Sequence, residues 1–419
     1  MNQTARAVRH ATMRPAAAQQ AATRPATARH TTVRHAAALV AGAAAVVAGA
    51  ALLVPAAAQA APAAPATPVR AATVPATFKA ASITWRTAQR GWVLGSAPCG
   101  RRRCTDVIGS SNGGTSWRVV GRIGAPIATG STPPDAGVDE IRFATDTVGW
   151  AFGPALYRTT NGGRSWAAAS VPGHGRQVIA LAAGATGTYA VVSPCREFAV
   201  KCASQKLSFW RTASPSGRSW TRIPLALASD NSASIATFGA SVYVVAPGTA
   251  DPSGGRLYAS TDGRHFSRRP VPCRASQEIG LAQVVPTSPT RVALLCDGNP
   301  GFSQAVKTVY RSVNTGRSYT SAGTTGAFGI EAELAASTSG TLLVGAWSDG
   351  TFMYLNNGHR QAWSMVLGLG DGGAGWNDLA FVTSREAWAV YGPVSAFAAN
   401  LGKLYVTRSG GRRWSLARL

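Results

Sequence analysis

The chain has 419 residues, of which 41 are Lys or Arg and 17 are Asp or Glu, so its formal net charge is +24. This length exceeds what one small core needs and suffices for a large β architecture. The basic excess attracts polyanions without specificity. A phosphate-binding glycine loop, an RNA-recognition motif and a helix-turn-helix are not visible in the sequence, so nucleic acid is expected only as a generic polyanion and not as a specific partner.

The first sixty residues have the order of a secretory signal peptide. A basic leader without acidic residues precedes an uncharged run over residues 36–54 and the sequence AAAQA at Ala56–Ala60. A basic segment, an apolar segment and an A-x-A site, in that order, favour export with cleavage after Ala60. The alternative is an uncleaved membrane anchor, because the uncharged run comes close to the length that spans a bilayer. We therefore expect a secreted or extracytoplasmic protein, bound to the membrane only if the leader is not cleaved.

Residues 61–80 are rich in Pro, Ala and Thr and are interpreted as a linker. Over residues 81–419 one polar turn is then repeated. It has the form SSNGGTSW at Ser110–Trp117, TTNGGRSW at Thr159–Trp166 and TRSGGRRW at Thr407–Trp414. Seven copies, one of them degenerate, recur about every fifty residues, a period typical of propellers and other repeat folds. Each copy ends on an aromatic residue: Trp117, Trp166, Trp220, Phe266, Tyr319, Trp363 and Trp414.

Each copy of this turn predicts a β-hairpin. Asn or Asp in the turn folds its side chain onto backbone N–H groups further along. A glycine three positions before the aromatic residue supplies a positive φ that other residues resist. The aromatic residue is expected to be the first inward residue of the next strand and to pack against the neighbouring unit. Six of the seven copies have the glycine: Gly114, Gly163, Gly217, Gly263, Gly316 and Gly411.

Short strands of alternating character surround each turn. In the second unit, EIRFA (140–144), VGWAFG (148–153), ALYRTT (155–160) and SWAAAS (165–170) have the pattern of four strands, and the first and last units repeat it. Helical periodicity is absent beyond the leader. The pattern predicts an all-β fold, a seven-bladed β-propeller of four-stranded antiparallel blades. A six- or eight-bladed propeller is the alternative, because the sixth copy has Arg360 in place of the glycine.

The repeated turn resembles the Asp-box, or BNR, repeat of the sialidase superfamily, over essentially all of residues 81–419. The G-W-[AV]-x-G strand that precedes L-Y-[RV]-T more closely resembles the photosystem II assembly-factor type of BNR propeller and its bacterial secreted relatives. The resemblance implies the propeller fold but no single function, because this repeat occurs on glycosidases, sorting receptors and assembly factors alike.

A sialidase-like active site finds little support in the sequence. Sialidases use an arginine triad, a Tyr–Glu nucleophile pair and an Asp acid/base. The R-I-P motif at Arg222 follows the third turn, where every unit has its outer strand, and each tyrosine falls at a position that the repeat uses for packing. No catalytic residue is therefore assigned, although a two-carboxylate glycosidase is not excluded. Four acids that stand in phase before first strands are the fallback candidates: Glu140, Glu278, Glu333 and Asp378.

These four acids have two interpretations. First strands line the central channel of a propeller, so the carboxylates are expected to ring its mouth. In one interpretation each acid caps backbone N–H groups between blades. In the other the acids form a site for a cation or a basic ligand. The matching positions in the other units are Ser82, Val178 and Ser234.

All six cysteines lie beyond the leader, and an even count outside the cytoplasm favours disulfides over a metal site. In a propeller, the connections from strand two to three and from strand four to the next strand one emerge on one face, where all six cysteines fall. We predict the pairs Cys99–Cys104, Cys195–Cys202 and Cys273–Cys296. No histidine lies near a cysteine at a zinc-ligand spacing, so neither a metal nor another cofactor is predicted.

Basic residues lie in or beside the disulfide loops, where arginine can bind carboxylate, sulfate or phosphate groups through two hydrogen bonds. The predicted ligand-binding residues are Arg101, Arg102, Arg103, Arg196, Lys201 and Arg274. The sequence thus predicts an exported, non-catalytic binding or scaffold module whose partner is an anionic cell-surface polymer or an envelope protein. The alternative is an extracellular glycoside hydrolase of sialidase-like type that acts on anionic glycans.

Overall fold

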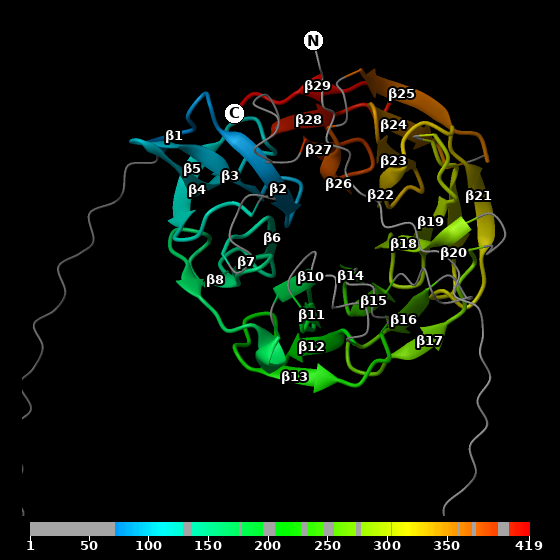
Figure 1. Ribbon diagram of the computed structural model, residues 1–419, viewed down its shortest axis with the longest axis horizontal. Helices are drawn as coiled ribbons and strands as arrows, with labels where there is room; N and C mark the ends of the chain where they lie inside the picture. The colour runs from blue at the N-terminus through cyan, green and yellow to red at the C-terminus, as the bar shows by residue number, and fades with distance from the viewer. Residues whose placement is uncertain are drawn as a thin grey trace, which may run out of the picture. The chain divides into compact units, whose positions relative to one another are not determined.

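Seven antiparallel sheets follow one another along the chain and surround a common axis in the computed structural model (Figure 1). The predicted seven-bladed β-propeller of four-stranded blades is confirmed, and the six- and eight-bladed alternatives are wrong. The structure describes residues 72–128, 136–175, 177–195, 206–227, 233–246, 255–273, 278–302, 304–358, 361–370, 374–392 and 402–419.

All described residues belong to one unit, Pro68–Leu419. The other unit, Met1–Thr67, contains the predicted signal peptide and lies outside the described residues. Within the described part of the chain, no helix is long and apolar enough to cross a membrane. Strand residues 72–73 and 79–80 fall in the segment that the sequence analysis interprets as a linker.

The first three blades occupy the N-terminal half of the ring. Blade 1 consists of β2 (Lys79–Trp85), β3 (Gly91–Cys99), β4 (Arg102–Ser110) and β5 (Arg118–Ile123), with β1 (Ala72–Thr73) paired to the outer edge of β5. Blade 2 consists of β6 (Glu140–Phe143), β7 (Gly149–Phe152), β8 (Tyr157–Thr159) and β9 (Ala167–Ala168). After the short 3-10 helix η1 (Pro172–His174), blade 3 consists of β10 (Gln177–Gly184), β11 (Gly187–Ser193), β12 (Ser208–Thr212) and β13 (Trp220–Ile223).

The other four blades complete the ring. Blade 4 consists of β14 (Ser234–Phe238), β15 (Ser241–Ala246), β16 (Arg256–Ser260) and β17 (Ser267–Arg269), and blade 5 of β18 (Glu278–Pro286), β19 (Val292–Gly298), β20 (Lys307–Ser312) and β21 (Thr320–Thr324). Blade 6 consists of β22 (Glu331–Ala336), β23 (Leu342–Trp347), β24 (Thr351–Asn356) and β25 (Ser364–Leu369), and blade 7 of β26 (Trp376–Phe381), β27 (Ala387–Tyr391), β28 (Lys403–Thr407) and β29 (Ser415–Leu416).

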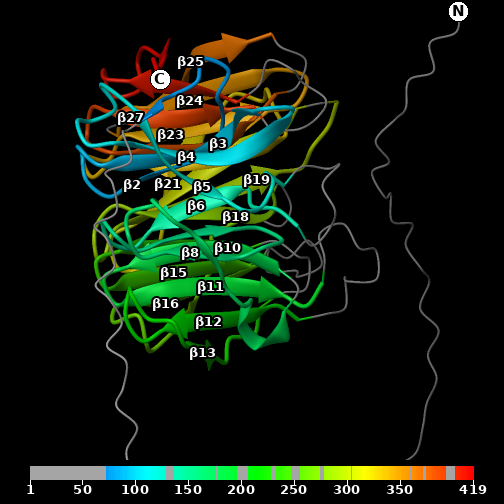
Figure 2. The same cartoon turned by 90° about the vertical axis from the view of Figure 1, so that its left-hand side faces the viewer.

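The first strand of each blade contacts the first strands of its two neighbours, so these seven strands surround the axis. Because every blade is antiparallel, the connections between second and third strands and between consecutive blades emerge at one end. We call this end the disulfide face, and the opposite end, where the repeated turns join third and fourth strands, the box face. Figure 2 shows the blades from the side, with the two faces at opposite edges of the strands.

The repeated turns are held by their own side chains, as predicted. In blade 1 the Ser110 hydroxyl accepts a hydrogen bond from Gly114 N at 2.9 Å, and Asn112 Oδ1 accepts one from Ser116 N at 3.0 Å. The glycine has a φ of 74°, which a residue with a Cβ rarely adopts. The third copy is an exception to the prediction, because Gly217 is not among the residues of positive φ.

The ring closes without sharing a strand between its two ends, since blade 1 contains only N-terminal strands and blade 7 only C-terminal ones. One backbone hydrogen bond crosses this seam, from Ala80 N to Gly402 O at 2.7 Å. Three indole rings pack across it. The ring centroids of Trp85 and Trp117 lie 5.3 and 5.8 Å from that of Trp388. Apolar packing therefore supplies part of the closure.

Asp378 of β26 supplies the polar part of the closure. Its Oδ2 accepts hydrogen bonds from the Ser82 hydroxyl at 2.5 Å and from Ile83 N at 2.9 Å, both in β2 of the adjacent blade. Its Oδ1 accepts one from Arg142 Nη2 of blade 2 at 2.9 Å. One carboxylate thus joins three blades at the point where the ring must close.

We predict that Asp378→Asn lowers the free energy of unfolding by about 3 kcal/mol, because it removes the charge that a part-buried guanidinium and two other donors share. Urea denaturation followed by tryptophan fluorescence measures the loss. Asp349→Asn, at an exposed acid in blade 6, is the control and should change stability by less than about 0.5 kcal/mol. Equal effects of the two substitutions would contradict the role of Asp378.

Candidate functional site

A charged cluster lies at the axis, on strands of four consecutive blades. Arg142 of β6 is its centre: Nη2 lies 2.7 Å from Glu140 Oε2 and 2.9 Å from Asp378 Oδ1, and Nη1 donates to the Ser82 hydroxyl at 3.0 Å. Glu333 of β22 adds a third carboxylate close enough to act on the charges of the others. The structure therefore brings three of the four predicted acids together, around an arginine that the sequence analysis did not single out.

Burial and mutual interaction shift the pKa values of three charged groups in this cluster. Burial raises the pKa of Glu140 to about 7, with Asp378 adding to the rise and Arg142 opposing it. Burial likewise raises the pKa of Glu333 well above its usual value, and the charges of Asp378 and Glu140 raise it further. Burial alone would lower the pKa of Arg142, but Asp378 and Glu140 outweigh it and raise the value. Three carboxyl groups thus interact with one guanidinium, whose single positive charge cannot balance three negative charges.

Side chains at matching positions of the first strands cap the neighbouring blade. Asp378 accepts a hydrogen bond from Ile83 N, and the Ser82 hydroxyl accepts one from Ile141 N at 3.1 Å. In the same way Gln283 Oε1 accepts one from Leu334 N at 2.5 Å. Among the four predicted acids, the capping interpretation thus agrees with the contacts of Asp378, while Ser82 and Gln283 make the same contact in two other blades.

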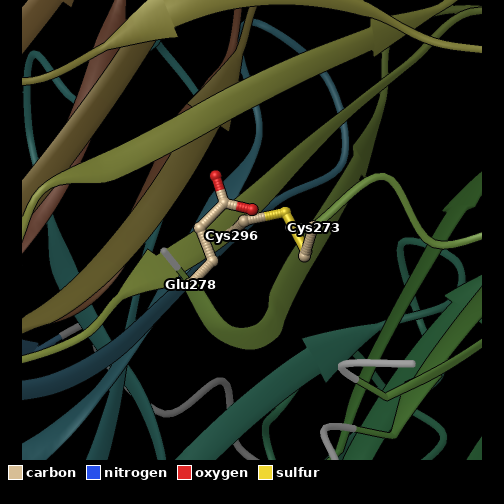
Figure 3. A group of neighbouring side chains, drawn as sticks. All are labelled: Cys273, Glu278 and Cys296. Carbon is tan, nitrogen blue, oxygen red and sulfur yellow. A yellow bond between two sulfur atoms is a disulfide. The ribbon is translucent and has the colours of Figure 1, made fainter. Parts of the chain in front are cut away.

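Glu278 does not belong to this cluster. It begins β18, is 6% exposed, and its carboxylate lies beside the Cys273–Cys296 disulfide (Figure 3). Glu333 pairs with Gly345 and Asp378 with Val390, and each partner is the fourth residue of the second strand of its blade. In blade 5 the fourth residue of β19 is Leu295, which pairs with Gln283 and not with Glu278. The sequence alignment of the fifth unit is therefore five residues out of phase. The physical cause is a long first strand with two register shifts, at 278/280 and 281/283.

Two of the three predicted disulfides, Cys99–Cys104 and Cys273–Cys296, are confirmed. Cys195 is also disulfide-bonded, and its predicted partner Cys202 lies outside the described residues. Both described disulfides lie on the disulfide face, one at the tip of the β3–β4 hairpin and one where blade 4 leads into blade 5.

Arg101, Arg102 and Arg103 lie at the tip of the β3–β4 hairpin and are exposed. Cys99 pairs with Arg102 in register, so the turn itself contains only Gly100 and Arg101. Arg103 folds back onto its own blade, since its Nη2 donates to Ser96 O at 2.7 Å and its Nε to the Ser96 hydroxyl at 3.1 Å. The tip therefore presents two free guanidinium groups and one anchored group. The other predicted binding residues, Arg196, Lys201 and Arg274, lie outside the described residues.

A cavity of about 370 Å³ lies at the axis toward the box face, between the first strands of blades 4 to 7. The sequence analysis did not predict it, because it depends on how four inner strands diverge and not on a motif in any one of them. Its walls are polar and apolar in about equal measure, because hydroxyl and amide groups lie beside the aliphatic side chains. Lining residues include Ile235, Gln283, Val285, Ala335, Ala380 and Phe381.

We predict that the stability of the Glu333→Gln variant, compared with that of the native chain, increases as pH rises from 4.5. Below its ordinary value of 4.5 the carboxyl is protonated in both folded and unfolded states. Above it the unfolded chain ionises first, so the native chain loses stability until the raised folded-state pKa is passed. Glutamine does not ionise and avoids that loss. Melting temperatures of both chains between pH 4.5 and 8.5 measure the effect, and a constant difference across this range would contradict the raised pKa.

No family model matches the chain, and no curated protein matches it in sequence. Solved structures do match it in fold. A structure of YCF48 bound to D1 peptide has a TM-score of 0.50 and 13% identity, and the match covers 81% of this chain and 96% of that one. Hydrazine synthase of Kuenenia stuttgartiensis has a TM-score of 0.53 and 10% identity, with 80% and 96% covered. YCF48 of Cyanidioschyzon merolae has a TM-score of 0.36 and 15% identity, with 84% and 89% covered. The chain is thus similar to known β-propellers in fold alone.

Proposed function

We propose that this chain is an exported, non-catalytic binding module that holds an anionic partner against its disulfide face. The observation that carries the proposal is the β3–β4 hairpin tip. There the side chains of Arg101 and Arg102 are exposed and make no hydrogen bond or ion pair to any described residue, while the Cys99–Cys104 disulfide fixes the strands beneath them.

Strand pairing and a disulfide fix the backbone that carries the arginines at this hairpin tip. The strand pairing of β3 and β4 continues to the pair formed by Cys99 and Arg102, and the disulfide joins the same two strands. Arg103 ties the tip back to Ser96. A preformed tip loses less conformational freedom on binding than a flexible loop would, so more of the interaction energy contributes to affinity.

The axial acids support binding rather than hydrolysis. A two-carboxylate glycosidase needs one acid free to protonate the leaving group and a second free to act as nucleophile or base. Here Glu140 and Asp378 share the guanidinium of Arg142, and Asp378 also accepts two hydrogen bonds from blade 1. Asp378 is thus occupied in joining the inner strands, and Glu140 in an ion pair within its own strand.

The partner we propose is an anionic cell-surface polymer, because exposed arginines suit phosphate and carboxylate groups. The self-bonded turns and the likeness to YCF48 in complex with a D1 peptide support a relation to BNR-type propellers that serve as binding modules. That support comes from fold alone and does not name the partner of this chain.

The test is binding of the full chain to two defined probes, polyphosphate and alginate, which carry phosphate and carboxylate groups. We predict that Arg101→Ser/Arg102→Ser weakens binding roughly tenfold or more, because each charge-assisted hydrogen bond contributes about 1.5 kcal/mol or more. Arg103 is left intact, since it supports the hairpin. Binding should also weaken as salt shortens the screening length below about 10 Å.

The matched control is Arg164→Ser/Arg264→Ser, which removes the same charge from exposed positions on the box face. It should leave binding nearly unchanged. If both double variants lose affinity equally, binding reports only net charge and the proposed site is wrong. Turnover of fluorogenic anionic glycosides that disappears in Glu333→Gln would overturn the non-catalytic assignment and favour the glycosidase alternative.

A further inference from the structure

Cys273, Glu278 and Cys296 form a three-residue group that the proposed function does not use. Their potential ligand atoms, two sulfurs and a carboxylate oxygen, all lie within 4.8 Å of one another (Figure 3). It is the one such group found among the residues that the structure describes. In the oxidised chain the two sulfurs are bonded to each other, so they do not bind a metal in this state.

The group is well enclosed. Cys296 is fully buried and Glu278 is 6% exposed, whereas Cys273 is half-buried. The Tyr310 hydroxyl lies 3.4 Å from Glu278 Oε1 and can donate to it. Lys307 pairs in register with Asp297, the residue after Cys296. Since successive side chains of a strand point to opposite faces, the lysine lies across the sheet from the sulfur.

We propose that reduction of the Cys273–Cys296 disulfide converts this group into a Zn²⁺ site, with two thiolates and the Glu278 carboxylate as ligands. Zinc accepts sulfur and carboxylate ligands in a tetrahedral arrangement, and three protein ligands leave the fourth position to water. Thiolates favour zinc over Mg²⁺ or Ca²⁺, which prefer oxygen ligands alone. This inference does not depend on the anionic partner proposed above.

The conversion needs a dithiol as reductant. One thiolate of the dithiol attacks Cys273 Sγ, the more exposed sulfur, and the S–S bond breaks with Cys296 Sγ as the leaving thiolate. The second thiol of the reductant then displaces Cys273 and closes the reductant's own disulfide. Two electrons and two protons have passed to the protein. Zn²⁺ binding releases the two thiol protons, and reoxidation of the thiolates would expel the metal.

The Cys99–Cys104 disulfide provides a contrast within the same chain. It lies at the hairpin tip beside Arg101, Arg102 and Arg103, whose positive charges oppose cation binding. It also lacks the buried carboxylate that the Cys273–Cys296 pair has. A thiol pair alone supplies two ligands, one fewer than the usual zinc site requires from the protein.

The test is a Zn²⁺ titration of the full chain, oxidised and after dithiothreitol reduction and removal of the reductant under nitrogen. The variant Cys99→Ser/Cys104→Ser/Cys195→Ser/Cys202→Ser serves as background, so that neither of the other cysteine pairs can contribute. We expect metal binding only after reduction, with zinc X-ray absorption showing two sulfur neighbours at about 2.3 Å and lighter neighbours nearer. Glu278→Gln, which can still form the disulfide, should weaken binding roughly tenfold or more, and Glu333→Gln should not change it.

Three results would overturn the proposal. They are equal zinc binding before and after reduction, unchanged affinity in Glu278→Gln, and unchanged binding in Cys273→Ser. The Glu278→Gln result decides the matter if the cysteine variant does not fold, because that variant keeps all of the sulfur atoms.

Discussion

The Asp378 carboxylate joins the two ends of the ring, and the rest of the propeller depends on that junction. This propeller shares no strand between its first and last blades, so other contacts must hold the seam closed. Here Asp378 accepts hydrogen bonds from Ser82 and Ile83 of blade 1 and forms an ion pair with Arg142 of blade 2. The tryptophans beside the seam exclude water from the adjoining strands. Closure thus combines the contacts of Asp378 and a backbone hydrogen bond with apolar packing.

Closure of this kind has a consequence for function. At the axis, Glu140 and Asp378 form ion pairs with Arg142, and burial raises the pKa of Glu140 and of Glu333. Charges that are free to meet a partner lie instead at the periphery, on the hairpin that Cys99–Cys104 clamps. The same disulfide face contains the Cys273–Cys296 group.

Much of the fold could be predicted because each blade repeats a turn whose glycine and hydroxyl or amide residues have direct conformational causes. The axial cluster was predicted only in part. Glu140, Glu333 and Asp378 stand in phase, but the two register shifts of β18 put Gln283, and not Glu278, at the fifth position. Arg142 could not be found from its own strand, because two of its partners, Ser82 and Asp378, come from blades far apart in sequence. The sequence spacing of Cys273, Glu278 and Cys296 likewise does not show that the three side chains lie close together in the folded chain.

The central claim is that Asp378 and Arg142 act together to close the ring. A double-mutant cycle of Asp378→Asn and Arg142→Met, with unfolding free energies from urea denaturation at pH 7.5, tests it most directly. Residues that share one network typically couple by about 0.5–3 kcal/mol, so the two losses should add to more than the loss in the double variant by roughly that amount. Losses that add within about 0.3 kcal/mol would show that the two side chains act independently and would contradict this account.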